Sequence, residues 1–227
     1  MDLCGKIAGV CYDEEGFDHI NKEDPEKTQK RIDRTLKSKH LSIYDHPMIT
    51  YYIQNLPKML AMVLNNEGYY DTSEKSARYT KVVRKEGSTI TEDEEHLYNK
   101  WVEIFKMRIQ DRYPNLPASK IKSLSQENAR YLVTVFMPTQ MVHTVSLRQT
   151  NNLMAWMKKY INENKGTPFE KQLASSMEQL TSEFVRLGVS VPELQTNDKN
   201  RQFSLFVDDM EKRYDYLNQE VSRAVLY

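Results

Sequence analysis

The stretch "HPMITYYIQNLPKMLAMVLNN", residues 46–66, carries strand signals followed by helix signals. Its first half is rich in Thr, Ile and Tyr, and such β-branched and aromatic residues are typical of strands. Pro57 then opens an apolar segment, and proline is favoured at the first position of a helix. We therefore expect a strand that leads directly into a helix, and a fold of mixed α and β elements.

Helix signals dominate the rest of the chain. Thr91 and Glu94 have the spacing of a capping box, as do Thr167 and Glu170, and Gly188 is suited to end the helix that Thr167 begins. Between these helices, "MVHTVSLRQ" (141–149) alternates as a strand and "TNNLMAWMKKYINEN" (150–164) predicts a further helix. The helix that Thr91 begins is expected to present an apolar stripe of Leu97, Trp101, Ile104 and Phe105.

Length and composition favour one core with an appendage. A chain of 227 residues, 39% of them hydrophobic, can bury a sizeable core. We expect a main domain over 1–190 and a helical C-terminal arm over 191–227. The arm's predicted helix presents an apolar seam of Phe203, Phe206, Met210, Tyr214, Leu217 and Val221.

Charge and cysteine content narrow the function classes. Lys plus Arg equals Asp plus Glu at 32 each, so the chain lacks the basic footprint of a duplex DNA binder. The sequence shows no charged and apolar leader and no long apolar run, so we expect a cytoplasmic protein with Cys4 and Cys11 reduced. No metal site is expected, because His40 and His46 stand six residues apart rather than four.

The stretch "TSEKSARYTKVVRK", residues 72–85, places polar side chains at every second position. In an extended chain Glu74, Ser76 and Arg78 share one face and offer an acceptor, a hydroxyl and a guanidinium together. This face suits a phosphate and its sugar; the alternative is a solvated edge strand with an ordinary charge pattern.

Phosphate binding in this chain must rely on side chains. The sequence has only seven glycines and neither a glycine-rich phosphate loop nor a dinucleotide fingerprint. Arginines are the natural candidates, because a planar guanidinium binds two phosphate oxygens at once. The candidates are those of "SARY", "ENARY" and "SLRQ", which are Arg78, Arg130 and Arg148.

The ordered motifs "VCY", "HLSIYDH", "SEKSARY", "ENARYLV" and "HTVSLRQTNNLMAW" together resemble the flavin-dependent thymidylate synthases. The resemblance is collinear and spans roughly residues 5–190. It implies helices packed on a small, mainly antiparallel sheet and a homotetramer with sites formed between subunits. It also implies reductive one-carbon transfer from methylene tetrahydrofolate to C5 of a uridine monophosphate nucleotide (dUMP to dTMP), with FAD as cofactor and NADPH as reductant.

The resemblance assigns roles to individual residues. It implies that a pyrimidine nucleotide binds at Glu74, Ser76, Arg78 and, from a neighbouring subunit, Arg130. It implies that the cofactor binds near Cys11, Ser42, Asp45, Asn65, Asn66, Ser146, Arg148 and Asn152. A buried structural thiol is the alternative for Cys11.

Two departures weaken the expected site. Asn65, Asn66 and Glu67 stand where the family has Arg-His-Arg, and Met157 stands where it places an arginine against the pyrimidine, with Lys158 beside it as a stand-in. Losing two phosphate-binding arginines would weaken FAD binding by about 3–6 kcal/mol. The sequence therefore leaves two hypotheses open. One is an enzyme, a methyltransferase of nucleotide biosynthesis, and the other is a nucleotide-binding homologue without FAD chemistry that acts as a binding or structural protein. Neither hypothesis involves DNA, RNA or a membrane.

Overall fold

A computed structural model describes residues 1–66, 69–76, 80–84, 89–163 and 166–196. The chain divides into two compact units, Met1–Gln195 and Thr196–Tyr227, and the first holds every element considered below. The helix predicted over 203–221 lies outside the described residues, and the boundary after residue 190 stays a prediction.

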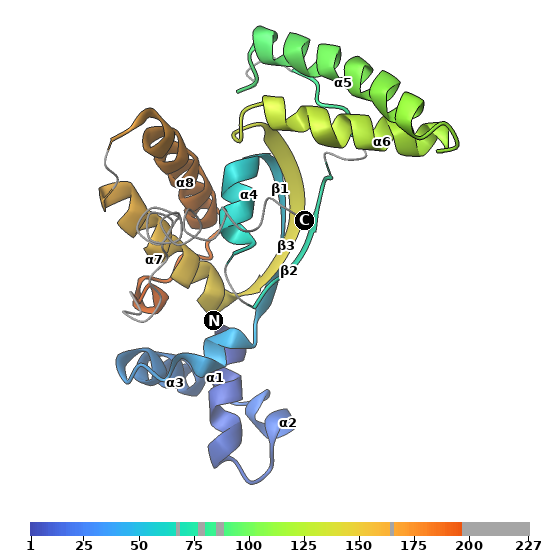
Figure 1. Ribbon diagram of the computed structural model, residues 1–227. Helices are drawn as coiled ribbons and strands as arrows, with labels where there is room; N and C mark the ends of the chain where they lie inside the picture. Colours follow the sequence, from blue (N-terminus) through green and yellow to red (C-terminus); the bar gives the residue numbers. More distant parts are fainter. Residues whose placement is uncertain (67–68, 77–79, 85–88, 164–165, 197–227) are drawn as a thin grey trace, which may run out of the picture. The chain divides into compact units, whose positions relative to one another are not determined.

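A three-stranded antiparallel sheet forms the centre of the first unit (Figure 1). Its strands are β1 (Met48–Pro57), β2 (Asp71–Glu74) and β3 (Pro138–Ser146), and β3 lies between the other two. Met48 pairs with Ser146 and Pro57 with Pro138, so β1 and β3 run side by side over their whole length. The expected small antiparallel sheet is confirmed.

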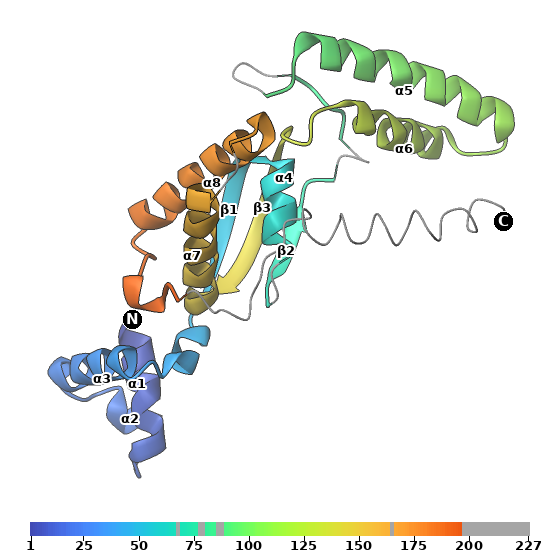
Figure 2. The same ribbon diagram turned by 60° about the vertical axis from the view of Figure 1, so that its left-hand side comes forward.

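Three helices gather on one side of this sheet (Figures 1 and 2). They are α4 (Lys58–Leu64), α7 (Leu147–Glu163) and α8 (Pro168–Arg186). Alternate residues of β3 are buried beneath them, whereas Gln140 and Val142 on the opposite face are exposed. The alternation follows from the two-residue period of a strand with one covered face.

The predicted capping boxes both form. Thr91 begins α5 (Glu92–Arg112) and Thr167 begins α8, each with reciprocal hydrogen bonds to the glutamate three residues on. α5 packs against α6 (Ala118–Ala129), which continues into η3 (Arg130–Leu132). The predicted stripe is partly wrong, because Tyr98 is fully buried while Leu97 is 38% exposed. The Tyr98 hydroxyl accepts from the Val82 N–H, which fixes the tyrosine inward.

The N-terminal segment folds into α1 (Asp2–Gly9), η1 (Val10–Tyr12), α2 (Phe17–Ile20), α3 (Pro25–Lys37) and η2 (Leu41–Asp45). The carboxylate of Asp24 caps α3 by accepting from the Glu26 N–H. α1 and α3 approach closely at Gly5, where an added Cβ would lie 2.7 Å from Ile32 Cγ1. The glycine therefore permits this helix contact.

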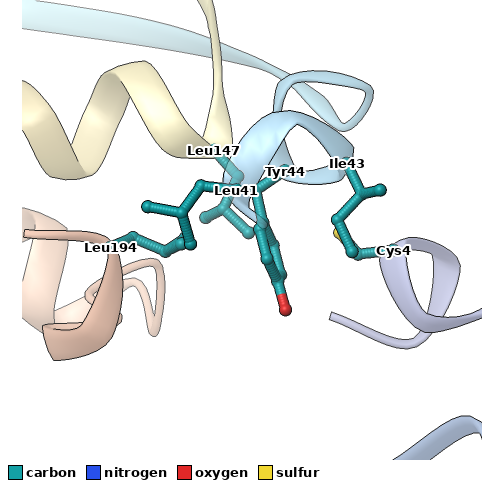
Figure 3. Close-up of a cluster of buried hydrophobic side chains, with 6 residues drawn as sticks. All are labelled: Cys4, Leu41, Ile43, Tyr44, Leu147 and Leu194. Carbon is teal, nitrogen blue, oxygen red and sulfur yellow. The ribbon is translucent and has the colours of Figure 1, made fainter. Parts of the chain in front are cut away.

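One buried cluster joins these N-terminal elements to α7 and η4 (Pro192–Leu194), as Figure 3 shows. Its members are Cys4, Leu41, Ile43, Tyr44, Leu147 and Leu194. The Tyr44 hydroxyl also hydrogen-bonds Thr35 Oγ1 at 2.9 Å, which satisfies its polar end inside the cluster. The cluster thereby holds η2 against the start of α7.

The strand expected over residues 72–85 is wrong for the described residues beyond Glu74, and residues 77–79 and 85 lie outside the described part of the chain. β2 pairs with β3, and the partner strand begins at Pro138, so little of β3 extends past the Glu74–Met141 pair. The Ser76 carbonyl instead accepts from both the N–H and the hydroxyl of Thr80. None of the described helices is both long enough and apolar enough to span a lipid bilayer.

Candidate functional site

Asp45 is the centre of a polar group at the junction of η2, β3 and α7. Its carboxylate accepts from Ser146 Oγ at 3.0 Å and from Arg148 Nη1 at 2.9 Å. The Ser146 hydroxyl also accepts from the Gln149 N–H at 3.0 Å, as an N-cap residue does. Ser146 therefore fixes the start of α7 and Asp45 at once.

The other predicted cofactor residues of this region lie on the same elements. Ser42 is exposed on η2, while Leu41, Ile43 and Tyr44 turn into the buried cluster (Figure 3). Asn152 is half-buried on α7, four residues after Arg148, so both share a helix face. The structure thus joins Asp45, Ser146 and Arg148 by hydrogen bonds, and Ser42 and Asn152 lie on the elements that carry this group.

The electrostatic balance of this junction is neutral. The Arg148 and Asp45 side chains are 34% and 50% exposed, so their ion pair contributes about 1 kcal/mol or less. Arg148 can exchange Asp45 for another anion at little cost. The carboxylate would nevertheless remain beside that anion.

Asn65 and Asn66 lie elsewhere, at the C-terminal end of α4. Asn65 Oδ1 is buried and has no hydrogen-bond partner among the described residues, and its main-chain carbonyl accepts from the Tyr70 hydroxyl. The Tyr70 ring lies 5.3 Å from the ring of His143. Asn66 is exposed, and Glu67 lies outside the described residues.

His143 is a buried polar residue that begins the motif "HTVSLRQTNNLMAW", and the sequence interpretation gave it no role. It is 2% exposed, and neither ring nitrogen has a hydrogen-bond partner among the described residues. Burial lowers the pKa of this imidazole, because a charged ring would lose its hydration. Its place among the inward positions of "MVHTV" was the available signal.

Cys11 is exposed on η1, and no described hydrogen bond joins it to the Asp45 group. The buried thiol is Cys4 instead, and burial raises its pKa. The alternative of a buried structural thiol is therefore wrong for Cys11. Its role in cofactor binding stays a prediction.

Glu74 ends β2 beside Lys58, the first residue of α4. Glu74 Oε1 lies 2.6 Å from Lys58 Nζ, and the two side chains are 14% and 30% exposed. The sequence interpretation missed Lys58, whose place directly after Pro57 was the only signal. Any nucleotide that uses Glu74 meets a carboxylate already held by an ammonium group.

The predicted nucleotide arginines do not meet Glu74 through any described contact. Arg78 lies outside the described residues. Arg130 starts η3, where its guanidinium lies 3.9 Å from Glu127 Oε1 and 5.2 Å from the centre of the Tyr131 ring. Its proposed approach from a neighbouring subunit stays a prediction.

On α7, Met157 and Lys158 occupy different environments. Met157 is 0% exposed, whereas Lys158 is exposed and donates to Gln195 Oε1 at 2.7 Å. The two side chains diverge because neighbours on a helix are about 100° apart. Lys158 is thus engaged at the surface, and its role as a stand-in stays a prediction.

The strand register of the sheet separates the predicted cofactor residues around Asp45 from the predicted nucleotide residue Glu74. Ser146 ends β3, whereas Glu74 pairs with Met141, five residues earlier. At about 3.4 Å per residue, these positions lie about 17 Å apart along the strand. Within one subunit, the Asp45 group and Glu74 therefore occupy separate parts of the sheet.

Comparison with protein families shows which family this chain belongs to. The family model described as thymidylate synthase complementing protein matches residues 2–160. The chain belongs to this family. The resemblance drawn from the motifs is thereby confirmed, and the match takes in every described site residue named above.

Solved structures similar to this chain include thymidylate synthase X (ThyX) from Helicobacter pylori with FAD and dUMP. It is 15% identical, with 86% of this chain and 90% of that chain covered at a TM-score of 0.46. The UMP/dUMP methylase PolB from Streptomyces cacaoi, bound with 5-Br dUMP, is 18% identical, with 84% and 93% covered at a TM-score of 0.47. No curated protein matches the chain.

Proposed function

We propose that this member of the thymidylate synthase complementing protein family transfers a one-carbon unit reductively from methylene tetrahydrofolate to C5 of a uridine monophosphate nucleotide. The observation that carries the proposal is the junction of Asp45, Ser146 and Arg148, with Ser42 and Asn152 on the same elements. Asp45 and Arg148 are 103 positions apart in the chain, yet the fold joins these residues to which the resemblance assigns the flavin. The setting proposed is the cytoplasm.

The residues at this junction fit FAD by the chemistry of their side chains. Ser42 and Asn152 offer neutral hydrogen-bonding groups for the ribityl chain and rings, and Arg148 offers a cation for the pyrophosphate. Away from this junction, at the end of α4, the buried Asn65 Oδ1 has no donor among the described residues, and a hydroxyl or an amine of the ligand would supply one. Bound FAD would supply the reducing equivalents taken from NADPH.

The chain's own residues orient the reactants. Glu74, held by Lys58, would accept from the nucleotide, while Arg78 and a neighbouring subunit's Arg130 would bind its phosphate. Because the junction and Glu74 lie about 17 Å apart within one chain, we propose that a homotetramer completes each site between subunits.

A second function is favoured by the charge of the junction. Arg148 is its only cation among the predicted cofactor residues that the structure describes, and Asp45 neutralises it. Two missing arginines cost about 3–6 kcal/mol of FAD binding. A nucleotide-binding protein without FAD chemistry would keep Glu74 and the nucleotide arginines and need no further cation.

The absorbance spectrum of the purified protein, with and without added FAD, tests the first proposal. A flavin spectrum and formation of dTMP from dUMP, methylene tetrahydrofolate and NADPH would support it. Arg148→Ala should then release flavin, whereas Arg34→Ala on the exposed side of α3 should not. Nucleotide binding without any flavin uptake would sink the enzyme and leave the second function.

Complementation of a thymidine-requiring strain gives an independent test. Without a cation beside the pyrimidine, the rate should fall about 100- to 1,000-fold, by analogy with losing one oxyanion-hole donor. We expect poor growth from the unmodified gene and no further loss with Lys158→Ala. Robust growth that Lys158→Ala abolishes would show that Lys158 replaces the missing arginine.

A further inference from the structure

Three lysines meet at a small cavity where the sheet ends. β1 and β2 both run antiparallel to β3, so both leave the sheet beside the first residues of β3. Lys58 follows β1 and Lys75 follows β2. Their backbone N–H groups donate to Met137 O at 2.9 Å and Gln140 O at 2.9 Å, and Lys81 lines the same cavity.

The cavity carries an excess of positive charge. Of the three ammonium groups, only that of Lys58 has an ion-pair partner among the described residues, which is Glu74. Lys75 and Lys81 are exposed, and no described carboxylate lies within ion-pair distance of either. Among the described residues at the cavity, three cations against one carboxylate favour binding of an anion.

The rest of the lining supplies hydrogen-bonding groups. Asn55, Thr80, Thr139 and Gln140 contribute to the wall. Gln140 Oε1 already accepts from the Tyr52 hydroxyl at 3.1 Å, so its amide N–H groups are the part available to a ligand. Donors of this kind complement phosphate oxygens.

The size of the cavity limits what it can hold. Its volume is about 110 Å³, whereas pockets for whole small molecules span about 300–1,000 Å³. A water molecule occupies about 30 Å³ in the liquid, so the space suits one phosphate group. A base and a sugar would have to lie outside it.

We propose that Lys58, Lys75 and Lys81 form a phosphate-binding site, separate from the arginines assigned to the nucleotide. The phosphate is either free or the terminal group of a ligand that lies outside the cavity. Lysine serves such a site as a mobile point charge, without the fixed geometry of arginine. The site does not depend on flavin.

Lysine modification with an acetylating reagent, read by mass spectrometry, tests the location of the site. Inorganic phosphate should slow acetylation of Lys75 and Lys81 and leave Lys27 and Lys37 on exposed α3 unchanged. Equal protection of all four lysines, or none at Lys75 and Lys81, would overturn the proposal.

Calorimetry with the same protein tests the affinity. Lys75→Gln with Lys81→Gln should weaken phosphate binding about tenfold or more, as expected for lost charge-assisted contacts. The control, Lys27→Gln with Lys37→Gln, removes the same charge and should change binding less than about twofold. Unchanged binding in the first variant, or no saturable binding in the wild type, contradicts the site.

Uridine, uridine monophosphate and inorganic phosphate distinguish the source of the group. Protection by the monophosphate and not by uridine assigns the site to a nucleotide's phosphate. Protection by inorganic phosphate alone assigns it to a free phosphate. Protection by uridine itself overturns the proposal. The flavin spectrum should be the same in the Lys75→Gln, Lys81→Gln variant, so failure here is distinct from failure of the proposed function.

Discussion

Arg148 Nη1 lies 2.9 Å from Asp45 Oδ2, and Ser146 Oγ lies 3.0 Å from the other oxygen of the same carboxylate. Both donors flank the point where β3 gives way to α7, so one carboxylate binds the end of the strand and the start of the helix. The carboxylate therefore links the two elements and matches the charge of Arg148.

Asp45→Asn should strengthen FAD binding. The amide keeps an acceptor for Ser146 and removes the negative charge beside Arg148, and an exposed pair of this kind is worth about 0.2–1 kcal/mol. We expect affinity to rise about 1.4- to fivefold in a fluorescence titration at low salt. Asp71→Asn, on exposed β2, is the control and should leave affinity unchanged. Weaker binding in Asp45→Asn would mean that the carboxylate itself holds the cofactor.

Met157→Arg should destabilise the protein rather than restore a catalytic cation. Met157 is 0% exposed, and an unpaired charge there would cost about 3–5 kcal/mol. Denaturant unfolding should show this loss. Met62→Arg on α4 is the matched control, because Met62 is 48% exposed and should change stability by about 0.5 kcal/mol or less. A fully stable Met157→Arg protein would show that this helix face opens to solvent.

His143 should make the fold less stable in mild acid. Burial lowers its pKa below the ordinary value of 6.5, so below that pH the unfolded chain binds a proton that the folded chain does not. The free energy of unfolding therefore falls as the pH drops from 6.5 toward the folded pKa. Above pH 6.5 the imidazole is neutral in both states, and the fold keeps its full stability.

Thermal unfolding of His143→Leu between pH 7.5 and 5.5 checks this. The variant should lose less stability than the wild type over that range, because its side chain does not titrate. Val185→Ala on α8, at an exposed position without a titratable group, should follow the wild type. The His19–Asp13 pair, which raises the pKa of His19, is present in all three proteins and cancels in the comparison. If His143→Leu lost as much stability in acid as the wild type, the acid sensitivity would not come from His143.

The two cysteines should react at very different rates. Cys4 is 0% exposed and burial raises its pKa, whereas Cys11 is exposed. Because the thiolate is the reactive form, an alkylating reagent should label one thiol quickly and the second only after denaturation. Cys11→Ser should abolish the fast phase and Cys4→Ser should keep it. Two fast thiols would show that the cluster around Cys4 opens readily.

The sequence predicted those elements whose ends are set by local chemistry. Thr91 and Thr167 begin helices because each bonds groups only three residues away. The length of β2 could not be predicted, since it depends on where β3 begins, more than sixty residues later. α1 was missed because Gly5 and Gly9 have low helix propensity, and the close packing against α3 that they permit is a tertiary property.

The candidate site was predicted as a set of residues and not as an arrangement. The motifs named Asp45, Ser146 and Arg148 separately, and only the fold shows that their charges cancel. Lys58 stands in none of the motifs that carry the resemblance, and His143 begins one of them without an assigned role. Their environments arise from strand register, which places Lys58 beside Glu74 and His143 beneath the helices.

Ser146 lies about 17 Å along β3 from Met141, the residue that pairs with Glu74, and this separation affects how such a chain can evolve. Substitutions more than about 7–10 Å apart usually have additive effects, so a change at one end of the strand leaves the other end undisturbed. Residues at the Asp45 junction can drift away from a cofactor while Glu74 and Lys58 stay under selection for another ligand. One strand thus separates the two proposed binding regions, which can be lost or kept independently.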